Sequence, residues 1–413
     1  MKIGNILFST FICIFLCGPA ALWIAQDKLH LALPSQITAE EAQYLSGGIE
    51  KAEIKANLNL NGFISEKLQN DLETKVGNYI PAKSNVLLNN AKLQRTLIEK
   101  SNMLFNWACY PTFYGSDYVF SPTQNRITPK AQSESNERSD GLVQFASHLK
   151  IFANAHPDKR FIVFLTPGLQ TALYNDSEQY TSNPITYSET VDILDNALGN
   201  VSNIDLLHMS YPDEQSYLAD YYHFDHHWNY RGAYKSYAQI CETLNIPVDR
   251  TSNIKPVDAV LYSGSYARDS LFEKAESFLG IENSLDPLYC QLSTGEIISI
   301  GAHAPYWLSP EIEKKYNAYG LYTGYMENGY IVSNNGDTNM LLIADSFGDS
   351  LQNLLPLSCK TLKQSNSLMA TSHDQPSLET LTNWDEMDAI VFVGHPDNYS
   401  TFVERNPNSL ANL

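Results

Sequence analysis

The sequence has 413 residues, of which 46 are acidic and 27 basic, and its net charge is −19 at pH 7. Nucleic acids and anionic lipid headgroups attract positively charged surfaces, so neither is expected as a partner of so negative a chain. The length suffices for one large α/β domain with additional elements, or for two domains.

The N-terminal residues 1–25 predict a membrane anchor or a signal peptide. Residues 6–25 carry no charge, and about twenty apolar residues can cross a bilayer core. The run is longer than the usual apolar core of a signal peptide, and no small-residue cleavage site closes it before Asp27, so a retained anchor is favoured over a cleaved signal. The rest of the chain is therefore expected outside the cytoplasm, either anchored to the membrane or secreted.

Four cysteines follow this segment, and in an exported protein they could form two disulfides in any of three pairings. The alternative is that all four are free, buried thiols. No CxxC pair is present, so a zinc finger is not predicted. The four are Cys109, Cys241, Cys290 and Cys359.

Between the anchor and the main domain, the sequence predicts a tether and a helical lead-in. Residues 26–60 are polar and without a clear pattern, as in a tether. In residues 61–105, apolar side chains recur every three to four positions, which is typical of amphipathic helices, and Pro81 divides the segment in two. The α/β domain is expected to occupy residues 106–413.

Short apolar runs in this domain predict the strands of a mostly parallel sheet. Each run is bounded by turn residues, as in strands that helices cover on both faces. A helix is expected at 141–155, before the first strand, and an insertion or lid with hairpin-like runs at 249–335. The expected fold is a three-layer αβα domain. The predicted strands are residues 160–166, 204–209, 340–344 and 389–393.

Residues 221–234 carry the densest group of chemically active side chains. Asp225 lies two residues before His227 and can orient its imidazole as a general base, and Asn229 suits the N-cap of a following helix. His223 and His226 are expected to be loop residues, and Trp228 a core residue. His223, Asp225 and His227 could instead bind zinc or manganese, but no second group of ligands accompanies them, so no metal is predicted.

A second segment supplies a serine nucleophile. The strand at 340–344 leads directly into Ser346, and a helix is expected to follow. Ser346 would then lie at the carboxyl edge of the sheet, where backbone N–H groups can bind an oxyanion.

Two alternatives to these residues are less favoured. Ser350 belongs to a Gly-Asp-Ser sequence at 348–350, but it would lie a full turn into the helix. His395 follows the last strand and could act as the base, yet Phe392 stands where its acidic partner would be expected.

Together, Asp225-His226-His227-Trp228 and Asp345-Ser346-Phe347 resemble the motifs of the DHHW proteins and of the alginate-type O-acetyltransferases, which are SGNH-hydrolase-like. The resemblance implies that Ser346 attacks an acyl ester, His227 acts as the base and Asp225 orients it, without a cofactor. Ala344 and Asn229 depart from the family, which often has Gly and Thr at these positions.

The resemblance also implies a function outside the cytoplasm. It implies O-acetyl transfer to a glycan, or removal of acetyl from one, with a membrane-bound O-acyltransferase partner that supplies the acyl group. The alternatives are a plain esterase and a non-catalytic protein that binds a glycan or another protein.

Overall fold

The computed structural model describes residues 67–77, 83–130, 136–167, 187–282, 289–291, 297–299, 330–365 and 383–406, and residues 17, 18, 21, 25, 368 and 410. The predicted tether and almost all of the predicted anchor lie outside these residues. Within the described residues, no helix is both long and apolar enough to cross a membrane.

The chain divides into two compact units. One comprises Met1–Phe120 and Ser265–Lys274, and the other comprises Ser121–Gly264 and Ala275–Leu413. The boundary expected after residue 105, between the helical lead-in and the α/β domain, does not coincide with the boundary between these two units, and it stays a prediction.

The first unit contains the two helices predicted for the lead-in, now observed as α4 (Lys67–Gly77) and α5 (Lys83–Phe105). The short strand β1 (Tyr110–Pro111) pairs antiparallel with β2 (Tyr118–Ser121), and α11 spans Ser265–Asp269. Arg95 of α5 holds this unit together, because its guanidinium donates to the carbonyl oxygens of Thr112 at 3.1 Å and Leu271 at 2.8 Å.

The second unit contains an eight-stranded sheet in the order β5-β4-β13-β11-β12-β10-β8-β9. The strands from β5 to β12 pair in parallel, and the remaining three extend the sheet antiparallel. This mostly parallel sheet confirms the α/β class. The four predicted strands are confirmed as β4 (Arg160–Leu165), β5 (Ile204–His208), β11 (Asn339–Ala344) and β13 (Ala389–Gly394).

The region 249–335, expected as an insertion or lid with hairpin-like runs, contains two sets of strands. Its first part forms a separate antiparallel pair, β6 (Asn253–Tyr262) and β7 (Glu276–Glu282). Its last part contributes strands to the main sheet: β8 (Tyr289–Gln291), β9 (Ile297–Ser299) and β10 (Tyr330–Val332). The central strand β12 (Thr361–Ser365) was not predicted, since four of its five residues are polar.

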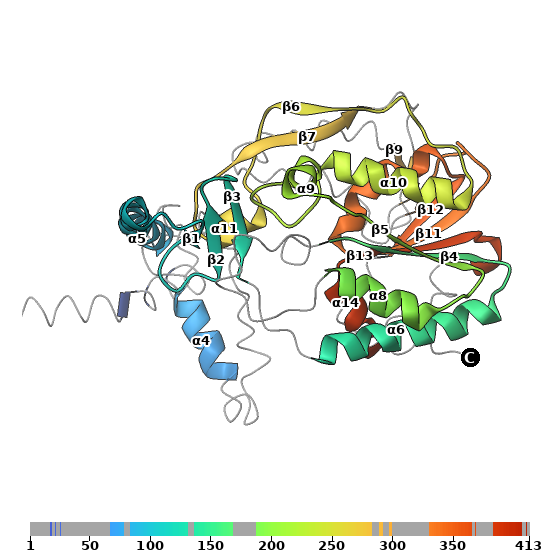
Figure 1. Cartoon of the computed structure of the whole chain (residues 1–413), viewed down its shortest axis with the longest axis horizontal. Helices are drawn as coiled ribbons and strands as arrows, with labels where there is room; N and C mark the ends of the chain where they lie inside the picture. The colour runs from blue at the N-terminus through green and yellow to red at the C-terminus, as the bar shows by residue number, and fades with distance from the viewer. Residues whose placement is uncertain are drawn as a thin grey trace, which may run out of the picture. The chain divides into compact units, whose positions relative to one another are not determined.

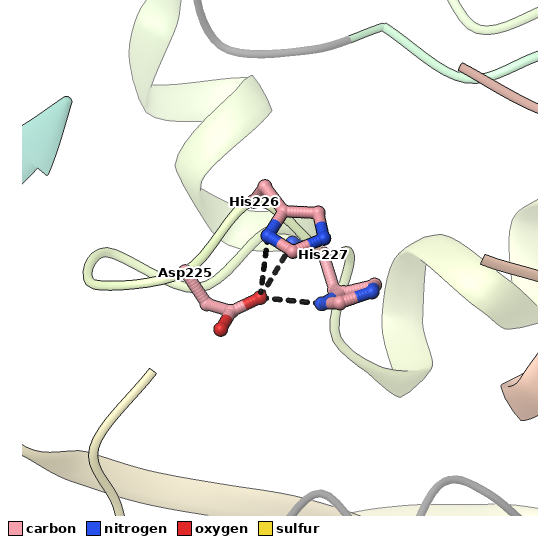
Figure 2. A group of neighbouring side chains, drawn as sticks. All are labelled: Asp225, His226 and His227. Carbon is pink, nitrogen blue, oxygen red and sulfur yellow. Dashed lines mark hydrogen bonds and ion pairs between the residues drawn. The ribbon is translucent and has the colours of Figure 1, made fainter. Parts of the chain in front are cut away.

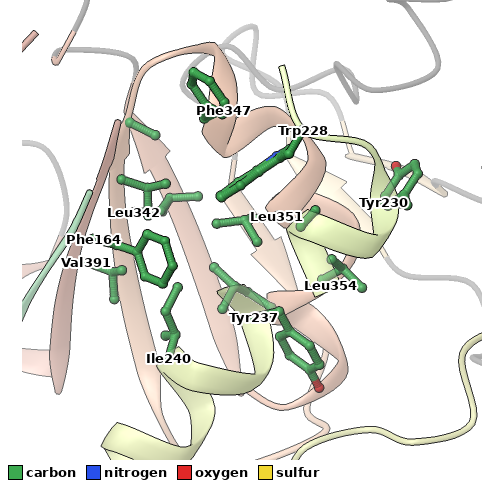
Figure 3. Close-up of a cluster of buried hydrophobic side chains, with 14 of the residues drawn as sticks. Phe164, Trp228, Tyr230, Tyr237, Ile240, Leu342, Phe347, Leu351, Leu354 and Val391 are labelled. Atoms are coloured by element: carbon green, nitrogen blue, oxygen red, sulfur yellow. The ribbon is translucent and has the colours of Figure 1, made fainter. Parts of the chain in front are cut away.

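Helices cover both faces of this sheet (Figure 1). On one face, α9 (Glu214–Asp220) and α10 (Tyr230–Leu244) lie near a core that includes Phe164, Tyr237 and Leu342 (Figure 3). On the other face, α6 (Asn136–Ala155), α8 (Tyr187–Leu198), α14 (Pro396–Ser400) and α15 (Phe402–Arg405) cover the alternate strand residues. The remaining elements are β3 (Arg126–Pro129) and the 3₁₀ helices η5 (Ser346–Asn353), η6 (Leu355–Leu357) and η8 (Trp384–Glu386).

Three of the four cysteines beyond the N-terminal segment are buried free thiols, namely Cys109, Cys241 and Cys359. Burial raises the pKa of Cys241 and of Cys359 to about 12, so both remain protonated thiols at neutral pH. The side chain of Cys290 lies outside the part of the chain that the structure describes.

Candidate active site

The histidine-rich segment forms a tight loop between α9 and α10. Tyr221 and Trp228 form an isolated antiparallel bridge across it, and the N–H of Tyr222 donates to the carbonyl oxygen of His227 at 3.2 Å. The side chain of Asn229 caps α10, as predicted, by accepting the N–H of Arg231 at 2.8 Å. These bonds close the loop upon itself and fix the backbone that carries Asp225 and His227.

Asp225 holds the imidazole of His227 from one side (Figure 2). Its Oδ1 lies 2.5 Å from His227 Nδ1 and also accepts the backbone N–H of His227 at 2.9 Å. Both residues are buried, with 3% of Asp225 and 5% of His227 exposed. An ionised carboxylate can only accept hydrogen bonds, so the proton of the neutral imidazole lies on Nδ1 and leaves Nε2 as an acceptor.

That free acceptor faces the serine. His227 Nε2 lies 2.7 Å from Ser346 Oγ, across a sequence separation of 119 residues. Ser346 is half-buried and follows β11 as the first residue of η5. The structure therefore brings the three predicted residues, Asp225, His227 and Ser346, into one continuous chain of hydrogen bonds.

Asp345 shapes the turn that presents Ser346. Its Oδ1 accepts the N–H of Phe347 at 2.9 Å, while its Oδ2 accepts the N–H of His395 at 2.7 Å and the Nδ2–H of Asn398 at 2.8 Å. This carboxylate joins the carboxyl end of β11 to that of β13 and does not bind His227.

Two glycines make room for this turn. A Cβ added to Gly394 would lie 2.7 Å from Asp345 Oδ2, and one added to Gly348 would lie 2.2 Å from Ala344 Cβ. Gly348 thus accommodates Ala344, which stands where the resembling family often has glycine.

Neither alternative residue takes the place of Ser346 or His227. Ser350 is fully buried, accepts Trp228 Nε1–H at 2.7 Å and donates to the carbonyl oxygen of Phe347 at 3.2 Å. The ring of His395 faces its own turn, with Nδ1 3.1 Å from Asp397 Oδ2. Of the described histidines, His227 is the one that bonds to Ser346 Oγ.

One of the three ligands considered for a metal site, His223, does not lie with the other two. The Nδ1 of His223 faces Glu276 Oε2 at 3.0 Å, whereas Asp225, His226 and His227 place possible ligand atoms within 4.8 Å of one another (Figure 2). However, Asp225 Oδ1 and His227 Nδ1 already bond to each other, and His226 Nδ1 is 3.6 Å from that oxygen. A cation would have to break the bond that orients His227, so the arrangement suits proton transfer better than coordination.

One residue of this site was missed in the sequence. Tyr262, at the end of β6, is fully buried and donates its hydroxyl to Asp225 Oδ2 at 2.8 Å. It lies within the region expected to be an insertion, and no local motif marks it.

Comparison with known proteins gives structural likenesses alone. No family model matches the sequence, and no curated protein matches it. A DHHW family protein from Eubacterium siraeum DSM 15702 matches with a TM-score of 0.52 and 14% identity, over 70% of this chain and 95% of that one. Bacillus cereus PatB1 with a sulfonyl adduct matches with a TM-score of 0.49 and 15% identity, over 68% of this chain and 93% of that one.

A third likeness is weaker still. The O-acetyltransferase domain of Pseudomonas putida AlgJ matches with a TM-score of 0.37 and 10% identity, over 69% of this chain and 90% of that one. Of these three likenesses, the first, to the DHHW family protein, has a TM-score above 0.5. The first confirms at the level of the fold what the motifs predict: this chain has the α/β fold of a DHHW family protein.

Proposed function

We propose that this protein is a serine-dependent acyl-ester enzyme. The observation that supports it best is the unbroken chain from Asp225 to His227 at 2.5 Å and from His227 to Ser346 at 2.7 Å. This is the arrangement in which a base activates a hydroxyl and a buried carboxylate orients the base.

In the proposed reaction, Ser346 Oγ attacks the carbonyl carbon of an acyl ester and its proton passes to His227 Nε2. The imidazolium stays paired with Asp225, and it then protonates the departing alcohol as the acyl-serine forms. A sugar hydroxyl or water, deprotonated by His227, then attacks the acyl-serine, and the imidazolium returns this proton to Ser346 Oγ as the bond between the acyl group and the serine breaks. Among the described residues no partner accepts the backbone N–H of Ser346, which supports a role for this N–H as an oxyanion donor.

The proposed substrate is a glycan outside the cytoplasm, which gains an acetyl group in one version of the reaction and loses one in the other. This part rests on the motifs at 225–228 and 345–347 and on the apolar N-terminal segment. In the transferase version, a membrane-bound O-acyltransferase supplies the acyl group and a glycan hydroxyl receives it. In the esterase version, water receives the acyl group, and the two are separated by whether acetate accumulates on the glycan or in solution.

The test uses the full-length protein in detergent with p-nitrophenyl acetate. We expect wild type and Ser350→Ala to release p-nitrophenolate, and Ser346→Ala and His227→Ala to lose that activity. Mass spectrometry of a quenched reaction should find acetyl on the peptide that contains Ser346. Turnover that survives Ser346→Ala would contradict the proposal, whereas the absence of both turnover and acetyl-serine in wild type would favour a non-catalytic binding protein.

A further inference from the structure

A cross-strand pair of the β6-β7 sheet contacts the loop that carries Asp225 and His227. Tyr262 and Glu276 are directly opposite each other in the register of these strands. Glu276 Oε1 accepts the backbone N–H of His223 at 2.8 Å and that of Phe224 at 3.1 Å, and its Oε2 lies 3.0 Å from His223 Nδ1. One carboxylate thus holds the backbone immediately before Asp225.

Tyr262 holds Asp225 itself. Its hydroxyl donates to Oδ2 at 2.8 Å, while Oδ1 is bonded to His227. The torsion that turns a carboxylate about its Cβ–Cγ bond is soft, so a carboxylate bound through a single oxygen can rotate away from its partner. With partners on both oxygens, the plane of the Asp225 carboxylate is fixed.

The ring of Tyr262 is also held in place. It packs against the rings of Tyr222, at a centroid distance of 4.8 Å, and Phe278, at 5.8 Å. Two residues on, a Cβ added to Gly264 would lie 2.3 Å from the carbonyl oxygen of Phe224. The segment just after β6 and the loop therefore approach too closely for a side chain to fit between their backbones at this point.

We propose that Tyr262 is a positioning residue, which fixes the Asp225 carboxylate so that His227 faces Ser346, with Glu276 holding the adjoining backbone. The inference rests on the proposed function. Tyr262 acts through Asp225 and His227, so its loss should slow the attack by Ser346 and leave substrate binding unchanged. The β6-β7 sheet is then part of the support of the site.

The test compares Tyr262→Phe with Tyr237→Phe in the full-length protein. Tyr237 is equally buried, but its hydroxyl bonds to Ser358 and to the N–H of Asp249, away from Asp225. We measure kcat and KM for p-nitrophenyl acetate, the rate at which phenylmethylsulfonyl fluoride modifies Ser346, and thermal unfolding. Tyr262→Phe should lower kcat and the modification rate about tenfold with KM unchanged, and Tyr237→Phe should keep both rates.

A structural measurement makes the inference independent of turnover. The Nδ1–H of an imidazole bonded to a carboxylate gives a low-field proton NMR signal, which should be present in wild type, absent in Asp225→Asn and displaced or broadened in Tyr262→Phe. An unchanged signal and unchanged rates in Tyr262→Phe would overturn the positioning role and leave the proposed function standing. Equal rate losses in Tyr237→Phe would also overturn it, because they would show a general effect of a lost buried hydroxyl. Wild-type protein that neither hydrolyses p-nitrophenyl acetate nor reacts with the sulfonyl reagent at Ser346 would overturn both proposals.

Discussion

Asp225 and Asp345 are both buried carboxylates, with 3% and 2% exposed, yet their sets of hydrogen-bond donors differ. Asp225, in the loop before α10, accepts from the ring of His227, from the hydroxyl of Tyr262 and from the backbone N–H of His227. Asp345, at the end of β11, accepts two backbone N–H groups and one amide side chain. The partners and not the residue type decide that one carboxylate orients a base while the other fixes a backbone turn.

The sharpest test of this difference is Asp225→Asn. An amide cannot stabilise the imidazolium as a carboxylate does, and it allows the wrong tautomer of His227, so we expect kcat for p-nitrophenyl acetate to fall about a thousandfold or more. Steady-state hydrolysis at neutral pH measures this. A loss of less than about tenfold would show that Asp225 does not serve His227 as we propose.

The corresponding change at Asp345 should act on stability. In Asp345→Asn one acceptor oxygen becomes an N–H₂ donor facing N–H groups, so buried donors lose their partner and the free energy of unfolding should fall by about 3 kcal/mol. Urea unfolding followed by circular dichroism measures this. Asp225→Asn is the matched control, and a larger loss of stability there than at Asp345 would reverse the assignment of the two carboxylates.

A smaller effect is expected at a side-chain hydrogen bond that joins the loop of Asp225 to the 3₁₀ helix after Asp345. The Nε1–H of Trp228, beside His227, donates to Ser350 Oγ, on the 3₁₀ helix that begins at Ser346. Trp228→Phe and Ser350→Ala should each cost about 1–2 kcal/mol, because each leaves a buried polar group without its partner. In a double-mutant cycle the two changes should couple by about 1 kcal/mol. Strict additivity would show that this bond does not link the loop to the turn.

The sequence predicts the parts of this site that are local and misses those that are not. Asp225 and His227 are two residues apart, and Ser346 follows a strand of continuous apolar residues, so pattern and motif find all three. Tyr262 is 37 residues from Asp225, and the pairing of His223 with Glu276 spans 53, so neither contact leaves a local pattern.

The same reasoning applies to the fold. The strands β4, β11 and β13 are buried on both faces and read as apolar runs. The sequence Thr-Leu-Lys-Gln-Ser of β12 does not, although it pairs with β11 along its whole length. Its neighbours in the sheet, and not its own composition, make it a strand.

The smallest effect is expected at His395, whose contact with Asp345 is made by its backbone. In His395→Ala that N–H remains, so kcat should stay within about threefold of wild type. The lost side chain bonds to Asp397, whose pKa is raised by burial but brought below its ordinary value overall by His395 and the Arg138 guanidinium. A carboxyl whose pKa is lowered in the folded state stabilises the fold at pH values above its ordinary pKa. This stabilisation is lost as the pH falls through the folded-state pKa. Wild type should therefore lose more stability than His395→Ala between about pH 5 and pH 2, as measured by thermal unfolding. A large fall in kcat would instead show that His395 takes part in the reaction, so that the turn after β13 does more than hold Asp345.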